Sequence, residues 1–272
     1  MEVWRPSDFE TAESNWDMRK REKGISCGDL SVLADFDLLC CVFSIHREVV
    51  FVAQQYLVSS WQAMLQMITN LCGKGYYHYH LTELPINKKQ KWEEIDEKII
   101  GKYKTDKSKW QRQRAKAKGV ANFYYLRWKH ILLIMHTEGE ITEEITYDDR
   151  FIDVRQNPIF FKISELTAFR IQKIDDKKIT VFLSSNTYKG LKDLIYNVAK
   201  TKNTFRMKET FNIINGFPAY SGILEQKNQL AKYLVSQAKK HNVELKRNGL
   251  RFNTKKKTVK NFDSPPIGDD SD

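Results

Sequence analysis

Residues 107–129 read KSKWQRQRAKAKGVANFYYLRWK, a basic segment that runs through a glycine into an aromatic one. Asp106 is a candidate N-cap and Gly119 a stop signal, so the basic half is predicted to be a helix. In the aromatic half, successive residues would alternate between two faces of a strand, which we expect to extend over Asn122–His136. This stretch therefore places a helix directly before a strand.

On the N-terminal side of this stretch, the sequence predicts two helices with a strand between them. Apolar residues recur at helical spacing over 49–72 and cover most of the circumference, which predicts a central helix that stops at Gly73. The stretch Gly75–Pro85, GYYHYHLTELP, is predicted to be a strand. A second helix follows, and its apolar stripe has the required spacing of three and four residues, with Trp92, Ile95, Ile99 and Tyr103.

On the C-terminal side, the sequence predicts an acidic hairpin arm over Thr137–Asp153, then strands, then helices. The strands are expected over Ile159–Ile163, Thr167–Ile174 and Lys178–Leu183, with the last two joined by a turn at Asp175–Asp176. Helices are expected over Thr187–Lys200 and from about Ser221 to His241.

These elements predict an α+β protein in which an antiparallel sheet, over about 75–185, is backed by the long apolar helix and followed by a helical basic C-terminal part. We expect four regions. They are a loosely ordered N-terminal arm (1–26), an α+β domain (27–185), the helical basic part (186–262) and a disordered acidic tail (263–272).

The charge of the chain indicates its class of partner. It has 45 Lys and Arg against 34 Asp and Glu, a net charge of +11, and four of the acids lie in the last ten residues. An excess of this kind favours a polyanion such as a nucleic-acid backbone. An anionic membrane surface is the weaker candidate, because no segment combines a strongly apolar face with a uniformly basic one.

The cysteines and the apolar segments indicate a cytoplasmic protein. The four cysteines, at positions 27, 40, 41 and 72, form no CxxC pair, so we expect them to be reduced. The N-terminal residues lack the apolar stretch of a secretory signal. Polar Gln and Ser residues interrupt the most apolar segment, 49–71, which is therefore predicted to be a core helix and not a membrane span.

Two features distinguish the basic segment 107–118 from an ordinary solvated helix: like charges surround it, and aromatic residues adjoin it. We expect it to contact a nucleic-acid backbone together with a second basic segment, 239–260, while aromatic residues of 123–128 stack on unpaired bases. Both DNA and RNA fit this pattern. The candidate binding residues are Lys107, Lys109, Arg112, Arg114, Lys116, Lys118, Tyr124, Arg127, Trp128, Lys246, Arg247, Arg251, Lys255, Lys256 and Lys257.

His78 and His80 are separated by one residue on the predicted strand, so their imidazoles would project side by side and could hold a divalent metal such as Mg or Mn. The triplet His78-Tyr79-His80 resembles the His-hydrophobic-His motif of rolling-circle initiator and relaxase endonucleases. That resemblance implies a metal-dependent single-strand DNA nickase with a tyrosine nucleophile, for which Tyr188 and Tyr125 are the candidates.

Other functions remain open. Cys72 with His78, His80 and Cys40 or Cys41 would be a zinc set of unusual spacing. Carboxylates of 138–153, with His136 nearby, could serve a two-metal nuclease, or this acidic stretch could shield a basic groove. A structural subunit of a nucleoprotein complex, with protein partners, is a further alternative. The leading expectation is nucleic-acid binding, in replication, mobilisation or defence of a bacterial or mobile genetic element.

Overall fold

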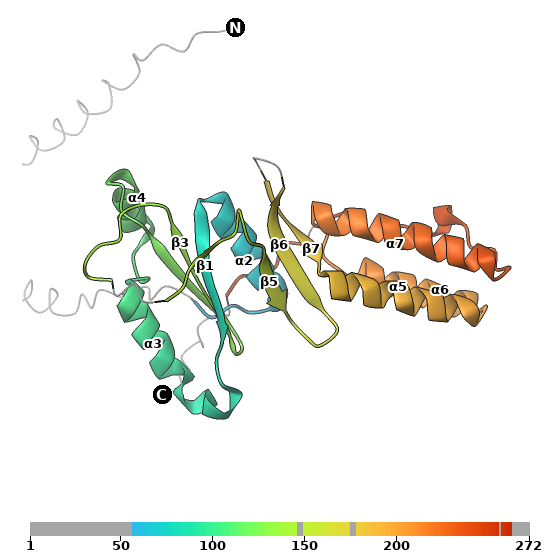
Figure 1. The fold of residues 1–272 in the computed structure, drawn as a ribbon, viewed down its shortest axis with the longest axis horizontal. Coiled ribbons are helices and arrows are strands. Elements are labelled where there is room, and N and C mark those ends of the chain that lie inside the picture. Colours follow the sequence, from blue (N-terminus) through green and yellow to red (C-terminus); the bar gives the residue numbers. More distant parts are fainter. Residues whose placement is uncertain (1–55, 146–148, 175–177, 256, 263–272) are drawn as a thin grey trace, which may run out of the picture. The chain divides into compact units, whose positions relative to one another are not determined.

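The computed structural model describes residues 56–145, 149–174, 178–255 and 257–262. Within these ranges the chain forms six α-helices and two antiparallel sheets, which confirms the α+β class (Figure 1). The predicted single sheet is in fact two separate sheets. Several predictions lie outside the described residues: the arm 1–26, the turn at 175–176, the tail 263–272, Lys256, and the cysteines at 27, 40 and 41.

The first sheet has the strand order β2-β3-β1-β4. Its strands are β2 (Phe123–Trp128), β3 (Ile131–Thr137), β1 (Tyr76–Glu83) and β4 (Ile152–Asp153). The prediction of one long strand over 122–136 is wrong, because a two-residue turn at Lys129 and His130 folds it into a hairpin. Lys129 takes a φ of 52° there, in the left-handed region that tight hairpin turns require.

Strand β1 contains a bulge that the sequence pattern does not reveal. Tyr76 pairs with Thr137, and His78 pairs with the very next residue of β3, His136, so Tyr77 is an extra residue in β1. Simple alternation predicts Tyr76 on the face of His78, but the bulge places Tyr76 in the core with Tyr79 instead. His78 and His80 then share the opposite face of the sheet.

Helix α2 (Trp61–Gly73) is the central helix, and it ends at Gly73 as predicted. It begins at Trp61, because Ser60 caps it by accepting a hydrogen bond from the Ala63 N–H, and residues 49–55 of the predicted helix 49–72 lie outside the described residues. Residues 56–58 are instead extended beside β2, where the Val58 N–H bonds to the Arg127 carbonyl at 2.8 Å. Buried side chains of α2 belong to the larger of two apolar cores.

The opposite face of the first sheet is covered by α3 (Trp92–Tyr103), which follows the short 3-10 helix η2 (Ile86–Lys91). Trp92 and Tyr103 are buried in the second core, with Ile95 and Ile99 packed against it, which confirms the apolar stripe. Central strand β3 contributes alternately to both cores, and for this reason it is apolar without interruption from Ile131 to Met135.

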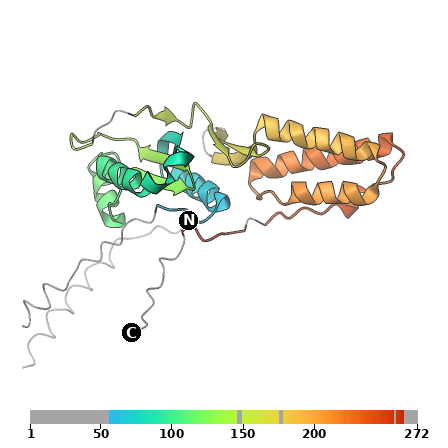
Figure 2. The same cartoon turned by 90° about the horizontal axis from the view of Figure 1, so that it is seen from below.

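The second sheet has the order β5-β6-β7, with strands close to those predicted: β5 (Ile159–Lys162), β6 (Ala168–Ile174) and β7 (Lys178–Leu183). Helices α5 (Ser185–Lys200), α6 (Thr204–Asn215) and α7 (Ser221–Lys240) then pack on one another, and α7 also packs on β7 (Figure 2). Helix α6 is not among the helices predicted from the sequence.

One basic segment and one acidic segment differ from their predicted secondary structure. The described residues of 241–262 are irregular apart from the 3-10 helix η3 (Arg247–Gly249), so the described part of the basic segment 239–260 is α-helical only at its start. The acidic stretch 138–145 is irregular and forms no hairpin in its described residues; Glu140 makes a single bridge to Val120. No helix in the described ranges has the length and apolar character needed to cross a membrane.

Candidate nucleic-acid interface

The basic segment 107–118 contains helix α4 (Lys109–Ala117), which is fixed at both ends. Ser108, and not the predicted Asp106, is the N-cap: its side chain accepts from the Gln111 N–H while the Gln111 side chain accepts from the Ser108 N–H at 2.6 Å. At the other end, Gly119 takes a φ of 73° and the Val120 N–H bonds to the Ala115 carbonyl. The basic helix is therefore formed by local signals.

The inner side of α4 is held by Arg112. Its Nη2 donates to the Thr105 carbonyl at 2.9 Å, and its guanidinium lies over the Tyr124 ring with 4.7 Å to the ring centre. Asn122 donates in turn to the Arg112 carbonyl at 3.0 Å. Arg112 and Tyr124, both predicted to bind nucleic acid, are thus used to attach α4 to the first sheet.

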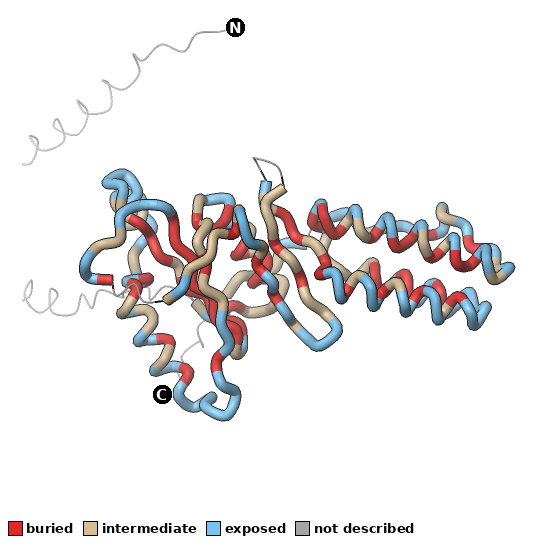
Figure 3. Tube along the Cα trace, in the orientation of Figure 1, coloured by how far each residue is buried: buried red, intermediate tan, exposed pale blue. Residues whose placement is uncertain are grey.

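The outer side of α4 is exposed along its length (Figure 3). In its first turn is Trp110, which is 69% exposed although tryptophan is normally mostly buried. At 100° per residue, Arg114 and Lys118 flank Trp110 on one side, and Lys109 and Lys116 lie on the other. We call this set, together with Lys107, the α4 surface.

The five cations of the α4 surface make no ion pair or side-chain hydrogen bond with any described residue. Some basic side chains elsewhere in the described chain do have acidic partners; Arg155, for example, pairs with Glu138 and Asp153. The positive charge of the α4 surface is consequently not neutralised by any residue that the structure describes.

The aromatic residues expected to stack on bases are in the interior. Phe123 and Tyr125 are buried in the second core and Trp128 in the larger one, with at most 8% exposure. Arg127 is also buried: its Nε and Nη2 donate to the Asp96 carboxylate at 2.7–2.9 Å. Arg127 and Trp128 are each only 8% exposed, because alternating aromatic residues here fill both faces of a covered strand. The exposed aromatic of this region is Trp110, a residue not among the sequence candidates.

The second basic segment is partly neutralised. Lys246 pairs with Glu244 at 3.1 Å. Arg247 donates to the Leu250 carbonyl and to Asn228, and its guanidinium lies over the Phe252 ring. The exposed candidates Arg251, Lys255 and Lys257 follow on the extended chain.

The histidine pair lies in a stack of rings and not in a ligand set. His78 stacks on His136 with ring centres 4.6 Å apart, and His136 stacks on Phe123 at 4.8 Å. His80 contacts the Arg150 carbonyl through Nδ1 at 3.1 Å. Among the residues that the structure describes, no three His, Cys, Asp or Glu side chains converge as metal ligands.

The other candidate metal ligand, Cys72, and the candidate nucleophiles, Tyr125 and Tyr188, do not contact the histidine pair in the described structure. Cys72 is buried in the larger core, where burial raises the pKa of its thiol to about 12, and His78 is on the opposite face of the sheet. Tyr125 is fully buried and donates to Asp96 at 2.6 Å, and both burial and this bond raise its pKa. Tyr188, on α5, donates to Gln229 at 3.0 Å. No described contact joins either tyrosine to the histidine pair, so this geometry does not assemble the nickase site.

Comparison with protein-family models, curated proteins and solved structures found no match to this chain. The α4 surface is therefore interpreted from its own geometry and charge.

Proposed function

We propose that the protein binds nucleic acid through the α4 surface. The observation that carries the proposal is a locally capped helix that presents a 69% exposed tryptophan in its first turn, together with five cations that have no acidic partner among the described residues. A phosphate backbone supplies the missing counter-charge, and a base supplies a flat face for the indole.

Two contributions to the free energy favour nucleic-acid binding by α4 over a helix that is only solvated. Like charges one turn apart on a helix repel by a few tenths of a kcal/mol per pair, a cost that phosphates would relieve. Stacking of a base on an aromatic side chain contributes about 1–3 kcal/mol. Because the helix is already capped in the free protein, binding requires little ordering of its backbone.

The contacts would be with phosphates and base faces, so the expected binding is strong at low salt and tolerant of sequence. Arg251, Lys255 and Lys257 could extend the contact. A role in replication, mobilisation or defence of a bacterial or mobile element would be compatible with such binding and stays a prediction.

The test is a salt titration of binding to labelled single- and double-stranded DNA and RNA. Replacing Lys109, Arg114 and Lys116 together by Ala should weaken binding and flatten the slope of log K against log salt by up to about three units, since each lost phosphate contact removes about 0.7–0.9. Trp110→Ala should weaken single-strand binding about tenfold while changing the salt slope little, because it removes stacking and no charge.

The matched control replaces Lys189, Lys208 and Lys232, one exposed lysine from each of α5, α6 and α7, by Ala. It lowers the net charge by the same three units away from α4. If the control weakens binding as much as the α4 triple variant, binding follows overall charge and the α4 surface is not the interface.

A further inference from the structure

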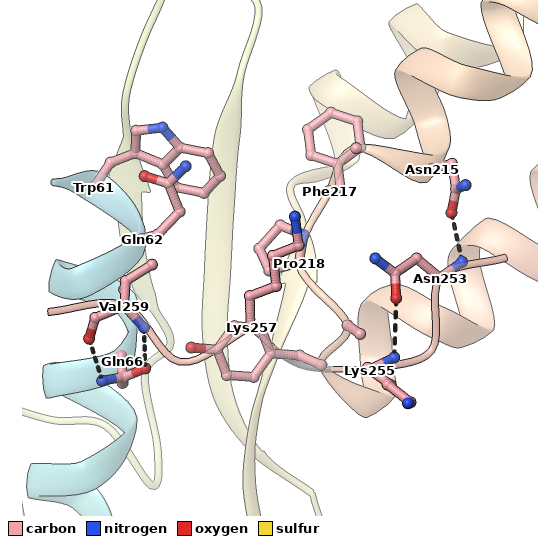
Figure 4. A pocket seen from close by; sticks show the side chains of 13 residues that line it. Trp61, Gln62, Gln66, Asn215, Phe217, Pro218, Asn253, Lys255, Lys257 and Val259 are labelled. Carbon is pink, nitrogen blue, oxygen red and sulfur yellow. Dashed lines mark hydrogen bonds between the residues drawn. The ribbon is translucent and has the colours of Figure 1, made fainter.

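A pocket of about 270 Å³ lies where α2, the α6–α7 loop and the extended C-terminal segment meet (Figure 4). Trp61 and Gln62 come from the first turn of α2, Phe217 and Pro218 from the loop, and Lys257 from the C-terminal segment. Its volume is near the lower limit of roughly 300 Å³ for small-molecule pockets, so it fits one small ligand.

Buried and amide side chains fix the walls of this pocket. Gln66 donates to the Val259 carbonyl at 3.2 Å and to Asn261 at 2.7 Å, which attaches the C-terminal segment to α2. Asn215 accepts from the Asn253 N–H at 2.8 Å. Behind the loop, the ammonium group of Lys227, a residue with no exposed surface, donates to the Asn215 and Phe217 carbonyls. The pocket is therefore largely formed before any ligand arrives.

Other polar groups of the lining remain open to a ligand. Among the described residues, the side-chain amide of Gln62 and the side-chain NH₂ of Asn253 have no hydrogen-bond partner, and the ammonium groups of Lys255 and Lys257 have no acidic one. The thirteen lining residues include no carboxylate. The pocket consequently favours an anion over a cation.

The apolar part of the lining is aromatic. Trp61 stacks on Phe169 of β6 with ring centres 5.3 Å apart, and Phe217 meets the same Phe169 edge to face at 6.2 Å. In Figure 4 the Lys257 side chain reaches toward the space between Trp61 and Phe217. An aromatic wall, free amides and an unpaired ammonium thus converge on one cavity.

We infer that this pocket binds one nucleotide unit, with the base against Trp61 and Phe217, its polar edge at Gln62 and Asn253, and its phosphate at Lys257. Aromatic side chains take the π-face of a base, amides match its donors and acceptors, and a lysine pairs with phosphate as a point charge. The site is separate from the α4 surface and does not depend on it.

The test measures binding of the four ribonucleoside 5′-monophosphates to the full chain by calorimetry. Lys257→Ala should weaken their binding at least about tenfold, because a charge-assisted contact is lost. Gln62→Ala should change the order of preference among the four bases. Lys232→Ala, on the exposed side of α7, is the control and should bind as the unchanged protein does.

Ribose 5-phosphate and the matching nucleosides complete the design. Each should bind at least about tenfold more weakly than the monophosphate, since each lacks one half of the recognised unit. Equal binding of ribose 5-phosphate would reduce the pocket to a plain anion site and overturn the inference. The same holds if Lys257→Ala has no effect, or if no monophosphate and no oligonucleotide binds in a Lys257-dependent manner.

A free nucleotide and one unit of a strand are told apart by short single-stranded oligonucleotides. If the pocket holds one unit of a strand, a trinucleotide should bind more tightly than the monophosphate, and Lys257→Ala should abolish that gain in affinity. The same effect of Lys257→Ala is expected in the variant that already carries Ala at Lys109, Arg114 and Lys116. If Lys257→Ala is silent while the α4 triple variant loses strand binding, the pocket inference fails and the α4 interface stands.

Discussion

At the scale of single residues, Asp96 is a carboxylate with no exposed surface on a helix whose other acids face solvent. It accepts hydrogen bonds from Arg127, whose Nε reaches both carboxylate oxygens and whose Nη2 reaches one, and a further hydrogen bond from the Tyr125 hydroxyl. The burial of Asp96 could have been predicted from the spacing of the apolar stripe on α3, because Asp96 follows Trp92 by four residues and so lies within the buried face. Its partner, on β2, could come only from the fold.

Replacing Asp96 by Asn should destabilise the protein by about 3–5 kcal/mol, because the Arg127 guanidinium stays buried without its counter-charge. Urea unfolding followed by circular dichroism measures the change. Glu97→Gln, an exposed neighbour on the same helix, should shift the free energy of unfolding by less than about 0.5 kcal/mol. Similar effects of the two substitutions would argue against the buried pair as a determinant of stability.

His136 is a second buried polar residue, 5% exposed between Phe123 and His78. Its Nδ1 donates to the Thr137 carbonyl at 2.8 Å. The pKa of His136 is lowered to about 4, and burial is the largest cause. The hydrogen bond to Thr137 raises this pKa, and the nearby His78 lowers it.

Because the unfolded chain titrates near 6.5, it takes up the proton before the folded one does. The stabilising contribution of neutral His136 should be fully present above pH 6.5 and lost as the pH falls to about 4, at a cost on the order of 3 kcal/mol. The free energy of unfolding, measured from pH 4 to 7.5, should lose this part of its pH dependence in His136→Gln. The control His130→Gln, in the β2–β3 turn, should retain it; an unchanged pH profile in His136→Gln would contradict the assignment.

At the scale of elements, α4 and the acidic stretch after β3 are joined by backbone contacts. The Glu140 N–H donates to the Gly119 carbonyl at 2.8 Å, and the Ala121 N–H donates to the Glu140 carbonyl at 2.9 Å. Gly139 makes this approach possible with a φ of 137°, and a Cβ there would lie 2.6 Å from the Gly119 oxygen. Gly119 itself, with a φ of 73°, faces open space.

These two glycines allow a matched comparison. Gly119→Ala should cost about 1 kcal/mol, because only the left-handed backbone conformation is unfavourable. Gly139→Ala should cost clearly more, since its Cβ would also meet backbone atoms that cannot move aside. Thermal unfolding of the two variants tests the order, and equal destabilisation would mean that the contact between 119 and 139 relaxes freely.

At the scale of the whole described molecule, one apolar core runs from the first sheet through α2 into the second sheet and helices α5–α7. Helix α2 itself contacts β1, β2 and β7. The division at 185/186 expected from the sequence therefore does not coincide with a break in this core.

A continuous core predicts one cooperative unfolding transition. In urea, tryptophan fluorescence and circular dichroism at 222 nm should give the same midpoint. Leu230→Ala, which leaves a cavity at a fully buried position of α7, should lower both midpoints together by the equivalent of about 2–5 kcal/mol. Lys232→Ala, on the exposed side of α7, should not. Two separated midpoints would show that helices α5–α7 unfold on their own.

The sequence by itself determined the features that depend on neighbours along the chain. Periodicity and terminal signals were enough for the α+β class, the apolar stripe of α3, the end of α2 at Gly73, the strands of the second sheet and the basic character of α4. Each of these follows from contacts within a turn or from alternation within a strand.

Only the tertiary structure decided which residues of the basic aromatic stretch 107–129 can meet a ligand. Burial depends on what packs against each face, so Arg127, Tyr125 and Trp128 became interior while Trp110 remained outside. The bulge in β1 and the pocket of Trp61, Phe217 and Lys257 likewise arise where segments distant in sequence come together. No local pattern encodes such a contact, because its free energy comes from a partner elsewhere in the chain.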